Sequence, residues 1–87
     1  MTVEIITPSK ILCIVENVTK LQAPGICGEF GVWKNHASMA TMLGDGIVSY
    51  TVEEEGNKKE CKYKIKDGFF GVMNNRIIIL AEEGELL

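Results

Sequence analysis

Hydrophobic and polar residues alternate along much of this chain with the period of two that is typical of half-buried β-strands. The alternation is clearest over residues 61–66, where a lysine occupies every second position. It recurs over residues 2–7, and Pro8 ends that run because proline cannot donate a hydrogen bond to a neighbouring strand. No stretch of useful length has the 3.6-residue period of an amphipathic helix. The pattern therefore predicts an all-β protein.

Turn-forming residues divide the chain into short segments. The segments predicted as strands are residues 2–7, 11–15, 18–23, 38–43, 47–52, 61–66, 69–73 and 76–81. The predicted connections are turns at Pro24-Gly25, 44–46, 66–68 and Asn74-Asn75, a charged loop over 53–60, and a tight corner or a bulge at Asn17. Residues 38–43 also fit a helical turn, but six residues are too few for a stable helix. This series of short strands predicts a β-sandwich or barrel in one domain over residues 1–87.

The stretch over residues 28–37 contains the only Trp and the only His of the chain. Its two glycines, Gly28 and Gly31, mark bends or points where another chain segment comes close, because glycine lacks a Cβ. One interpretation is a corner between strands whose core residues are Phe30, Val32 and Trp33. The other is a contact site that presents Glu29 and His36. Residue chemistry alone favours the corner.

Composition excludes several classes of function. The net charge of −3 argues against nucleic acid, because phosphates need a basic face. Lysines do cluster over residues 58–66, but glutamates lie among them, as on a solvated hairpin. With a single histidine and no C-x-x-C pair, no metal site is expected. The apolar run over residues 77–81 is far too short to span a membrane, and we expect a soluble intracellular domain without a signal peptide.

Candidate catalytic groups are few. The three cysteines, Cys13, Cys27 and Cys61, are expected to be reduced and mostly buried. Cys27 precedes His36 by nine residues, but no third group is evident to orient the histidine for nucleophilic catalysis. The methionines Met39, Met42 and Met73 fit core packing. These observations favour a binding or assembly module over an enzyme.

The order of short motifs along the chain resembles the N-terminal domain of the epsilon chain of F-type ATP synthases. The motifs are Ile6-Thr7-Pro8, Ala23-Pro24-Gly25, Gly28-Glu29-Phe30-Gly31-Val32, His36-Ala37, Thr41, Leu43-x-x-Gly46, Asp67-Gly68-Phe69-x-x-Val72 and the run Ile77-Ile78-Ile79-Leu80-Ala81. Each motif is weak alone, but the ordered set covers nearly all 87 residues.

The resemblance implies a ten-stranded β-sandwich of two packed, mostly antiparallel sheets. It implies a non-catalytic subunit of the central stalk, without cofactors, that links the gamma subunit to the membrane c-ring and couples proton or sodium translocation to ATP synthesis. Such a subunit is peripheral, on the cytoplasmic face of a bacterial membrane. A chain with this role should present an exposed, partly apolar face that becomes dry only in the complex.

Two groups of site residues follow from the resemblance. The predicted contact with the c-ring comprises Gly28, Glu29, Phe30 and Gly31, and the predicted contact with gamma comprises Thr7, His36 and Thr41. A carboxylate at a glycine bend suits basic and amide groups on the loops of the ring. For His36 and Thr41, a turn cap and an ordinary strand position remain alternatives.

The chain departs from the family pattern in two places. Lys34-Asn35 stands where the family commonly has Pro-Gly, so this turn needs a different solution, and Asn35 can adopt the left-handed conformation. The sequence ends at Leu87, without the helical hairpin that follows in most members. The segment is missing either naturally or through truncation, so the sequence supports no claim of nucleotide binding or of an inhibitory arm. Met1 and the acidic tail slightly favour a naturally short chain.

The main alternative is a carrier domain of the biotinyl or lipoyl type, which is also a small β-sandwich. Such a domain needs a modifiable lysine at the tip of a tight hairpin, and Lys58-Lys59 is the candidate here. Its neighbours are glutamate and asparagine instead of the usual methionine or aspartate.

Overall fold

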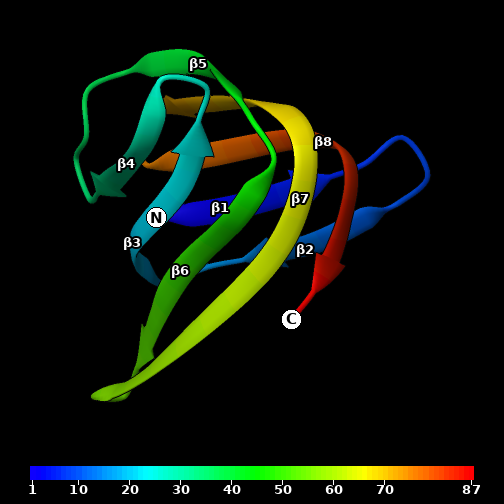
Figure 1. Ribbon diagram of the computed structural model, residues 1–87. Coiled ribbons are helices and arrows are strands. Elements are labelled where there is room, and N and C mark those ends of the chain that lie inside the picture. The colour runs from blue at the N-terminus through cyan, green and yellow to red at the C-terminus, as the bar shows by residue number, and fades with distance from the viewer.

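The computed structural model describes residues 1–87 and contains eight β-strands and no helix. The strands are β1 (Thr2–Ile6), β2 (Ile11–Val15), β3 (Val18–Gly25), β4 (Gly28–Trp33), β5 (Met39–Leu43), β6 (Gly46–Glu54), β7 (Asn57–Met73) and β8 (Arg76–Leu86) (Figure 1). The predicted all-β class is confirmed. No helix that is long and apolar enough to cross a membrane is present.

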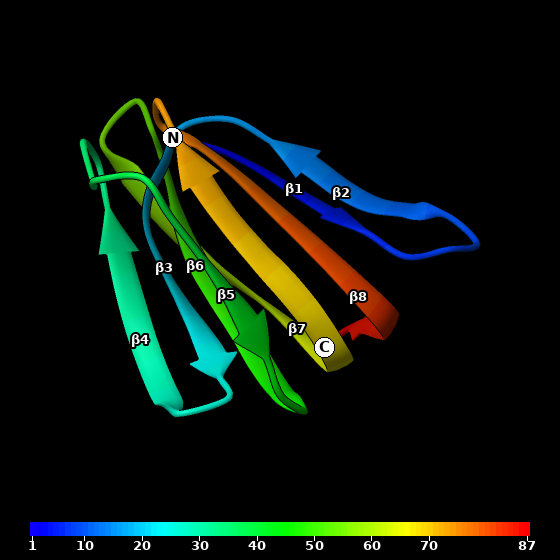
Figure 2. The same cartoon turned by 90° about the horizontal axis from the view of Figure 1, so that it is seen from above.

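The strands pack as two layers. The first layer contains β4, β3, β6, the first half of β7 and the end of β8. The second layer contains β5, the second half of β7, the first half of β8, β1 and β2. All pairings are antiparallel except that of β1 with β8. Figure 2 shows the two edge strands, β4 and β2, on opposite sides of the molecule.

The structure has eight strands instead of the ten that the resemblance implied, because two strands contribute to both layers. β7 pairs with β6 over its first half and with β5 over its second, and β8 follows it around the same curve (Figure 1). Each layer thus has five strand segments, but the chain is not broken between them. The prediction of a turn over residues 66–68 is wrong, because β7 continues through these residues and only bends there. Asp67 takes a positive φ of 44°, and its N–H donates to Asp45 Oδ1 at 2.9 Å.

Two further predicted connections are wrong. The charged segment over residues 53–60 is a hairpin with the two-residue turn Glu55-Gly56, whose φ angles are 50° and 81°. Opposite charges, such as Glu53 and Lys58, face each other across its strands and extend the ladder. Pro24-Gly25 lies inside β3, and the turn that follows is Ile26-Cys27.

Other connections agree with the sequence. Asn74-Asn75 forms the predicted two-residue hairpin turn, with both residues at positive φ, 51° and 61°. Asn17 forms a corner with φ 62°, and the pairing register shifts just after it, between Val18 and Lys20. Asn35 takes the left-handed conformation that its sequence position predicted, with φ 65°.

The core lies between the layers and is built from alternate residues of every strand except β2. Its buried hydrophobic residues are Val3, Ile5, Val18, Leu21, Ala23, Val32, Leu43, Val48, Tyr50, Tyr63, Ile65, Phe70, Val72, Ile77, Ile79 and Ala81. Phe30 joins the two layers, because its ring meets the ring of Phe70 edge to face at 5.0 Å between centroids. The expectation that Trp33 and all three methionines fill the core is wrong. Trp33, Met42 and Met73 are more than half exposed.

Candidate docking surfaces

The outer side of the second layer is strongly apolar. Cross-strand pairing places Met42, Phe69, Leu80, Ile6 and Ile11 in one row across five strands. The adjacent row contains Ala40, Gly71, Ile78, Glu4 and Ile14. We call these two rows, together with Met73, the apolar face. The only ion pair on it joins Glu4 to Arg76 at 3.8 Å.

The sequence produces this face because two strand segments are apolar at both alternate positions. In residues 69–73, Phe70 and Val72 point into the core, while Phe69 and Met73 point outward. In residues 77–81 the inward positions are again buried, and Ile78 and Leu80 are 40% and 46% exposed. An unbroken apolar run is typical of a strand covered on both sides. One side of this layer is covered by the first layer, and the other side lies open.

Two hollows indent the apolar face. The larger, of about 910 Å³, is lined by Phe69, Gly71, Met73, Ile78 and Leu80, with Ser38 and Asn74 among its rim residues. The smaller, of about 500 Å³, shares Phe69 and Leu80 and is bordered by Thr7 of the β1–β2 loop. Apolar hollows on an exposed sheet face are typical of surfaces that receive side chains of a partner protein.

The outer side of the first layer is polar by comparison. Pairing places Gly31, Gln22, Ser49 and Lys62 in one row, and Trp33, Lys20, Thr51 and Glu60 in the next. We call this surface the polar face. Its one large aromatic group, the Trp33 indole, lies over Gly31, where an added Cβ would come within 2.8 Å of Cη2. Ile47, the second residue of β6, is the only large aliphatic side chain of β3, β4 and β6 that is exposed.

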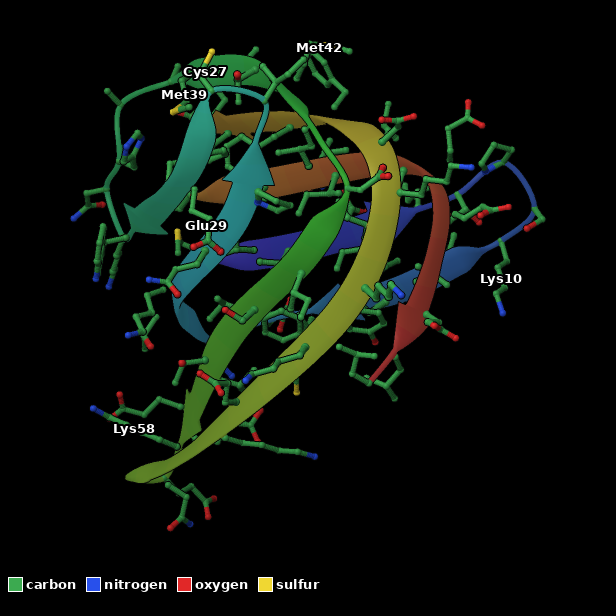
Figure 3. All side chains as sticks on the ribbon, in the orientation of Figure 1. Lys10, Cys27, Glu29, Met39, Met42 and Lys58 are labelled. Carbon is green, nitrogen blue, oxygen red and sulfur yellow. The ribbon has the colours of Figure 1, made fainter.

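The predicted c-ring residues form the hairpin between β3 and β4. Gly25 pairs with Gly28, whose φ of 127° suits glycine, and an added Cβ at Gly25 would lie 2.6 Å from the Gly28 oxygen. Glu29 is exposed on the polar face. The turn is held against β5 because the Ile26 N–H donates to Met42 O at 3.1 Å. In Figure 3, Cys27 and Met42 lie at one end of the molecule, with Lys58 at the opposite end.

Of the three predicted gamma contacts, only Thr7 lines a hollow of the apolar face, and none of the three is hydrogen-bonded to another. Thr7 is buried and closes the β1–β2 loop, since its Oγ1 donates to Lys10 O at 3.0 Å. His36 is half-buried in the β4–β5 connection, with Nδ1 2.7 Å from Ala37 O. Thr41 is half-buried in β5, between the outward-facing Ala40 and Met42. No contact to a partner has been tested for any of these residues, so their roles remain predictions.

Sequence reasoning missed the residues of the apolar face itself. Met42 and Met73 were assigned to the core, and Phe69, Ile78 and Leu80 were not singled out as surface residues. The available signal was the lack of alternation over residues 77–81, which leaves apolar side chains on both sides of the strand.

The thiols do not form a reactive centre. Cys27 is exposed in the β3–β4 turn, contrary to the expectation of mostly buried thiols, and it has no hydrogen bond to His36. Cys13 and Cys61 are half-buried. Burial raises the pKa of Cys13, although hydrogen bonds with Tyr50 and Tyr63 partly offset this effect. The Tyr50 hydroxyl donates to Cys13 Sγ at 3.9 Å, which fits a protonated, structural thiol.

The geometry supports neither a metal centre nor a carrier lysine. No group of three or more His, Cys, Asp or Glu side chains is arranged to hold a metal ion. Lys58 and Lys59 are not at a loop tip. They lie inside β7, opposite Glu53 and Val52, so the hairpin tip consists of Glu55 and Gly56 instead. The carrier alternative is therefore not favoured.

Comparison with known proteins gives a consistent result. Residues 1–86 match the family model described as "ATP synthase, Delta/Epsilon chain, beta-sandwich domain". The ATP synthase epsilon chain of Anaeromyxobacter sp. (strain K) is 39% identical over 85 residues, which cover 98% of this chain and 61% of that protein. The epsilon chain of Carboxydothermus hydrogenoformans is 38% identical over 82 residues, or 94% of this chain and 58% of that one. The chain thus spans about three-fifths of the length of these relatives.

Solved structures agree with the fold. A chain in the Euglena gracilis mitochondrial ATP synthase assembly of OSCP, F1 and c-ring matches with a TM-score of 0.81 and 26% identity, covering 97% of this chain and 51% of that one. A chain in the central stalk and c-ring structure of the Tetrahymena thermophila mitochondrial enzyme matches with a TM-score of 0.78 over 98% of this chain and 65% of that one. At 15% identity, the latter match concerns the fold alone. Because the family model matches nearly the whole chain, this chain belongs to the family of β-sandwich domains of ATP synthase delta/epsilon chains.

Proposed function

We propose that this chain acts as the β-sandwich of an epsilon-type subunit in the rotor of an F-type ATP synthase, where it fastens the gamma subunit to the c-ring. The observation that carries the proposal is the apolar face on a member of this family. A sandwich whose core is already complete gains no stability from a second apolar surface exposed to water. Such a surface is typical of a permanent partner.

In this proposal the apolar face binds gamma. Its hollows receive apolar side chains of that subunit, and Thr7 borders the smaller hollow. His36 and Thr41 remain predicted contacts. The chain is non-catalytic and transmits ion-driven rotation mechanically. Through the assembly it is held at the cytoplasmic face of a bacterial membrane, which fits the bacterial relatives. The coupling ion is determined by other subunits.

The β3–β4 hairpin binds the c-ring in the same proposal. Glu29 is exposed beside Gly28 at a turn that is hydrogen-bonded to β5, so its carboxylate projects from a fixed backbone. A charge in such a position sets orientation and partner choice more than affinity.

The first experiment compares two substitutions that are matched in exposure but lie on opposite faces. Leu80 is 46% exposed on the apolar face, and Ile47 is 45% exposed on the polar face. Leu80→Lys should weaken binding to the gamma subunit of the same organism by roughly 10- to 100-fold, because the lysine charge would be buried in an apolar contact. Ile47→Lys should leave binding within about twofold. Equal losses in both variants, or no binding by the unmodified chain, would contradict the proposal.

The c-ring contact has its own test. Glu29→Lys should reduce retention of the ring in co-purification with gamma, and the loss should grow as ionic strength falls, because a reversed charge repels basic loops most strongly at low salt. Glu53→Lys, at the other end of the sandwich, serves as the control. Equal retention by the two variants would count against Glu29 as a contact.

A further inference from the structure

Two asparagines that are 40 residues apart hold each other by reciprocal hydrogen bonds. The Asn35 backbone N–H donates to Asn75 Oδ1 at 2.7 Å, and Asn75 Nδ2 donates to Asn35 Oδ1 at 3.2 Å. Asn35 lies in the β4–β5 connection, and Asn75 lies in the turn between β7 and β8. We call this pair the asparagine clasp.

Backbone conformation explains why asparagine occupies both positions. The φ angles of Asn35 and Asn75 are 65° and 61°, in the left-handed region that only glycine and, less easily, asparagine or aspartate adopt at low cost. Glycine would satisfy the backbone but has no side chain to bond across. Asparagine alone combines this conformation with both a donor and an acceptor at its tip.

The clasp provides the only hydrogen bonds that tie the β4–β5 connection to a distant part of the chain. Within the connection, the His36 N–H donates to Trp33 O at 3.2 Å, and His36 Nδ1 lies 2.7 Å from Ala37 O. Both of these bonds are local, so apart from the clasp the connection is held only at its ends, where Trp33 pairs with Lys20 and Met39 pairs with Val72. The other half of the clasp is anchored, because the Thr2 N–H donates to Asn75 O at 2.9 Å and thus fixes the β7–β8 turn to β1.

The two segments joined by the clasp form one end of the larger hollow on the apolar face. Ser38, from the connection, and Asn74, from the β7–β8 turn, both belong to its rim. His36 lies between the clasp and Ser38 along the chain. The β5–β7 ladder fixes one side of this rim, since Met39 pairs with Val72. The clasp is a second tie, which holds the preceding residues of the connection beside the β7–β8 turn.

We propose that Asn35 and Asn75 are positioning residues for gamma binding, because their clasp holds the rim of the larger hollow in its binding shape before the partner arrives. This inference rests on the proposed function of the apolar face. A connection that is already ordered loses less conformational entropy on binding than a free one. Opening the clasp should lower affinity for gamma without removing any side chain that touches it.

The test uses glycine substitutions, which keep the positive φ while removing the side chain. In Asn75→Gly, the Asn35 amide should exchange with solvent at least about tenfold faster by NMR, and affinity for gamma should fall roughly three- to tenfold. Asn17→Gly is the matched control, since Asn17 also has a positive φ, 62°, but lies in the β2–β3 corner, takes no part in the clasp and is outside both hollows. It should change neither quantity. The double variant Asn35→Gly/Asn75→Gly should bind gamma no more weakly than Asn75→Gly alone, because both changes break one interaction.

The two readouts separate this inference from the proposed function. Exchange at the Asn35 amide is measured in the chain alone and reports the clasp whether or not gamma binds. Faster exchange with unchanged gamma affinity in Asn75→Gly would reduce the clasp to a structural role and overturn the inference, while the proposed function would stand. Unchanged exchange would show that the clasp does not hold the connection. A loss of affinity in Asn17→Gly equal to that in Asn75→Gly would also overturn it.

Discussion

The two outer faces of the sandwich differ although the layers beneath them are built alike. In both layers, alternate residues of each strand point inward and are buried. The remaining positions form the row Met42, Phe69, Leu80, Ile6 and Ile11 on one face and the row Gly31, Gln22, Ser49 and Lys62 on the other. The inward positions build the core, and the outward positions give the two faces their different character.

Strand β7 shows this division within a single element. Its first half lies in the first layer and exposes Lys62 and Lys64, whereas its second half lies in the second layer and exposes Phe69 and Met73. The buried positions of this strand are all aromatic or aliphatic, namely Tyr63, Ile65, Phe70 and Val72. One strand can therefore supply a continuous core and two surfaces of opposite character, because its side chains alternate between faces.

The largest expected effect separates the inner and outer positions of β7. Phe70 is fully buried and packs edge to face on Phe30, whereas the adjacent Phe69 is 41% exposed on the apolar face. Phe70→Ala should lower the free energy of unfolding by about 3–5 kcal/mol, as for other buried phenylalanines. Phe69→Ala should lower it by less than about 1.5 kcal/mol but weaken gamma binding more than tenfold. Urea unfolding and binding titrations measure both. A similar stability loss in the two variants would break the distinction.

A second, pH-dependent effect arises inside the first layer. Burial, together with the nearby Cys13 thiol, raises the pKa of Tyr50 above its usual range. In the folded chain Tyr50 therefore keeps its proton at a pH where the unfolded chain has lost it, so folding stability falls as pH rises above about 10. The expected slope for this group is about 1.4 kcal/mol per pH unit.

The Tyr50→Phe variant provides the comparison for this pH effect. It removes the ionising hydroxyl but keeps the ring that stacks on Tyr63 at 6.2 Å between centroids. Unfolding free energies measured at intervals between neutral and strongly alkaline pH should fall less steeply in this variant. The pKa values of Cys13 and Tyr63 are also raised by burial, so part of the slope should remain. Identical alkaline slopes in the two proteins would show that Tyr50 is not the group responsible.

Alternation in the sequence predicted the inner positions well but could not assign the outer ones. The burial of Tyr63 and Ile65 follows directly from their spacing between lysines. No such contrast exists over residues 77–81, where both sides of the strand are apolar. There the sequence does not reveal which side faces the core. Trp33 was misplaced for a related reason, because a large aromatic residue is compatible with either face of an edge strand.

Glycines and clusters of charged residues predict turns or loops at several positions where the structure has paired strands. The sequence predicts a turn at Gly25. In the structure Gly25 is part of the β3–β4 ladder, where its missing Cβ leaves room for the Phe30 ring and the Gly28 oxygen. The charged residues over 53–60 predict a loop, but they pair across the β6–β7 hairpin. The partner contacts of Gly28, Glu29 and Gly31 depend on surfaces outside this chain, so neither the sequence nor the fold can decide them.

The smallest expected effects compare one glycine from each outer face. At Gly31, on the polar face, an added Cβ would lie 2.8 Å and 2.9 Å from two atoms of the Trp33 ring. At Gly71, on the apolar face, the nearest atom would be Phe69 Cε1 at an ordinary 3.7 Å. Gly31→Ala should displace the exposed indole and lower stability by about 1 kcal/mol or less. Gly71→Ala should leave stability unchanged or raise it by about 0.4–1 kcal/mol, because alanine restricts the unfolded chain.

Fluorescence and binding should respond in opposite ways in these two variants. Trp33 is the only tryptophan, so Gly31→Ala should shift the emission to longer wavelength and increase quenching by acrylamide. Its gamma affinity should not change, since the proposed gamma contact lies on the apolar face. Gly71→Ala should leave the emission unchanged but lower gamma affinity, because the new methyl group would fill part of the floor of the larger hollow. If Gly31→Ala weakened gamma binding as much as Gly71→Ala, gamma would have to contact both outer faces, and the division between them would not hold.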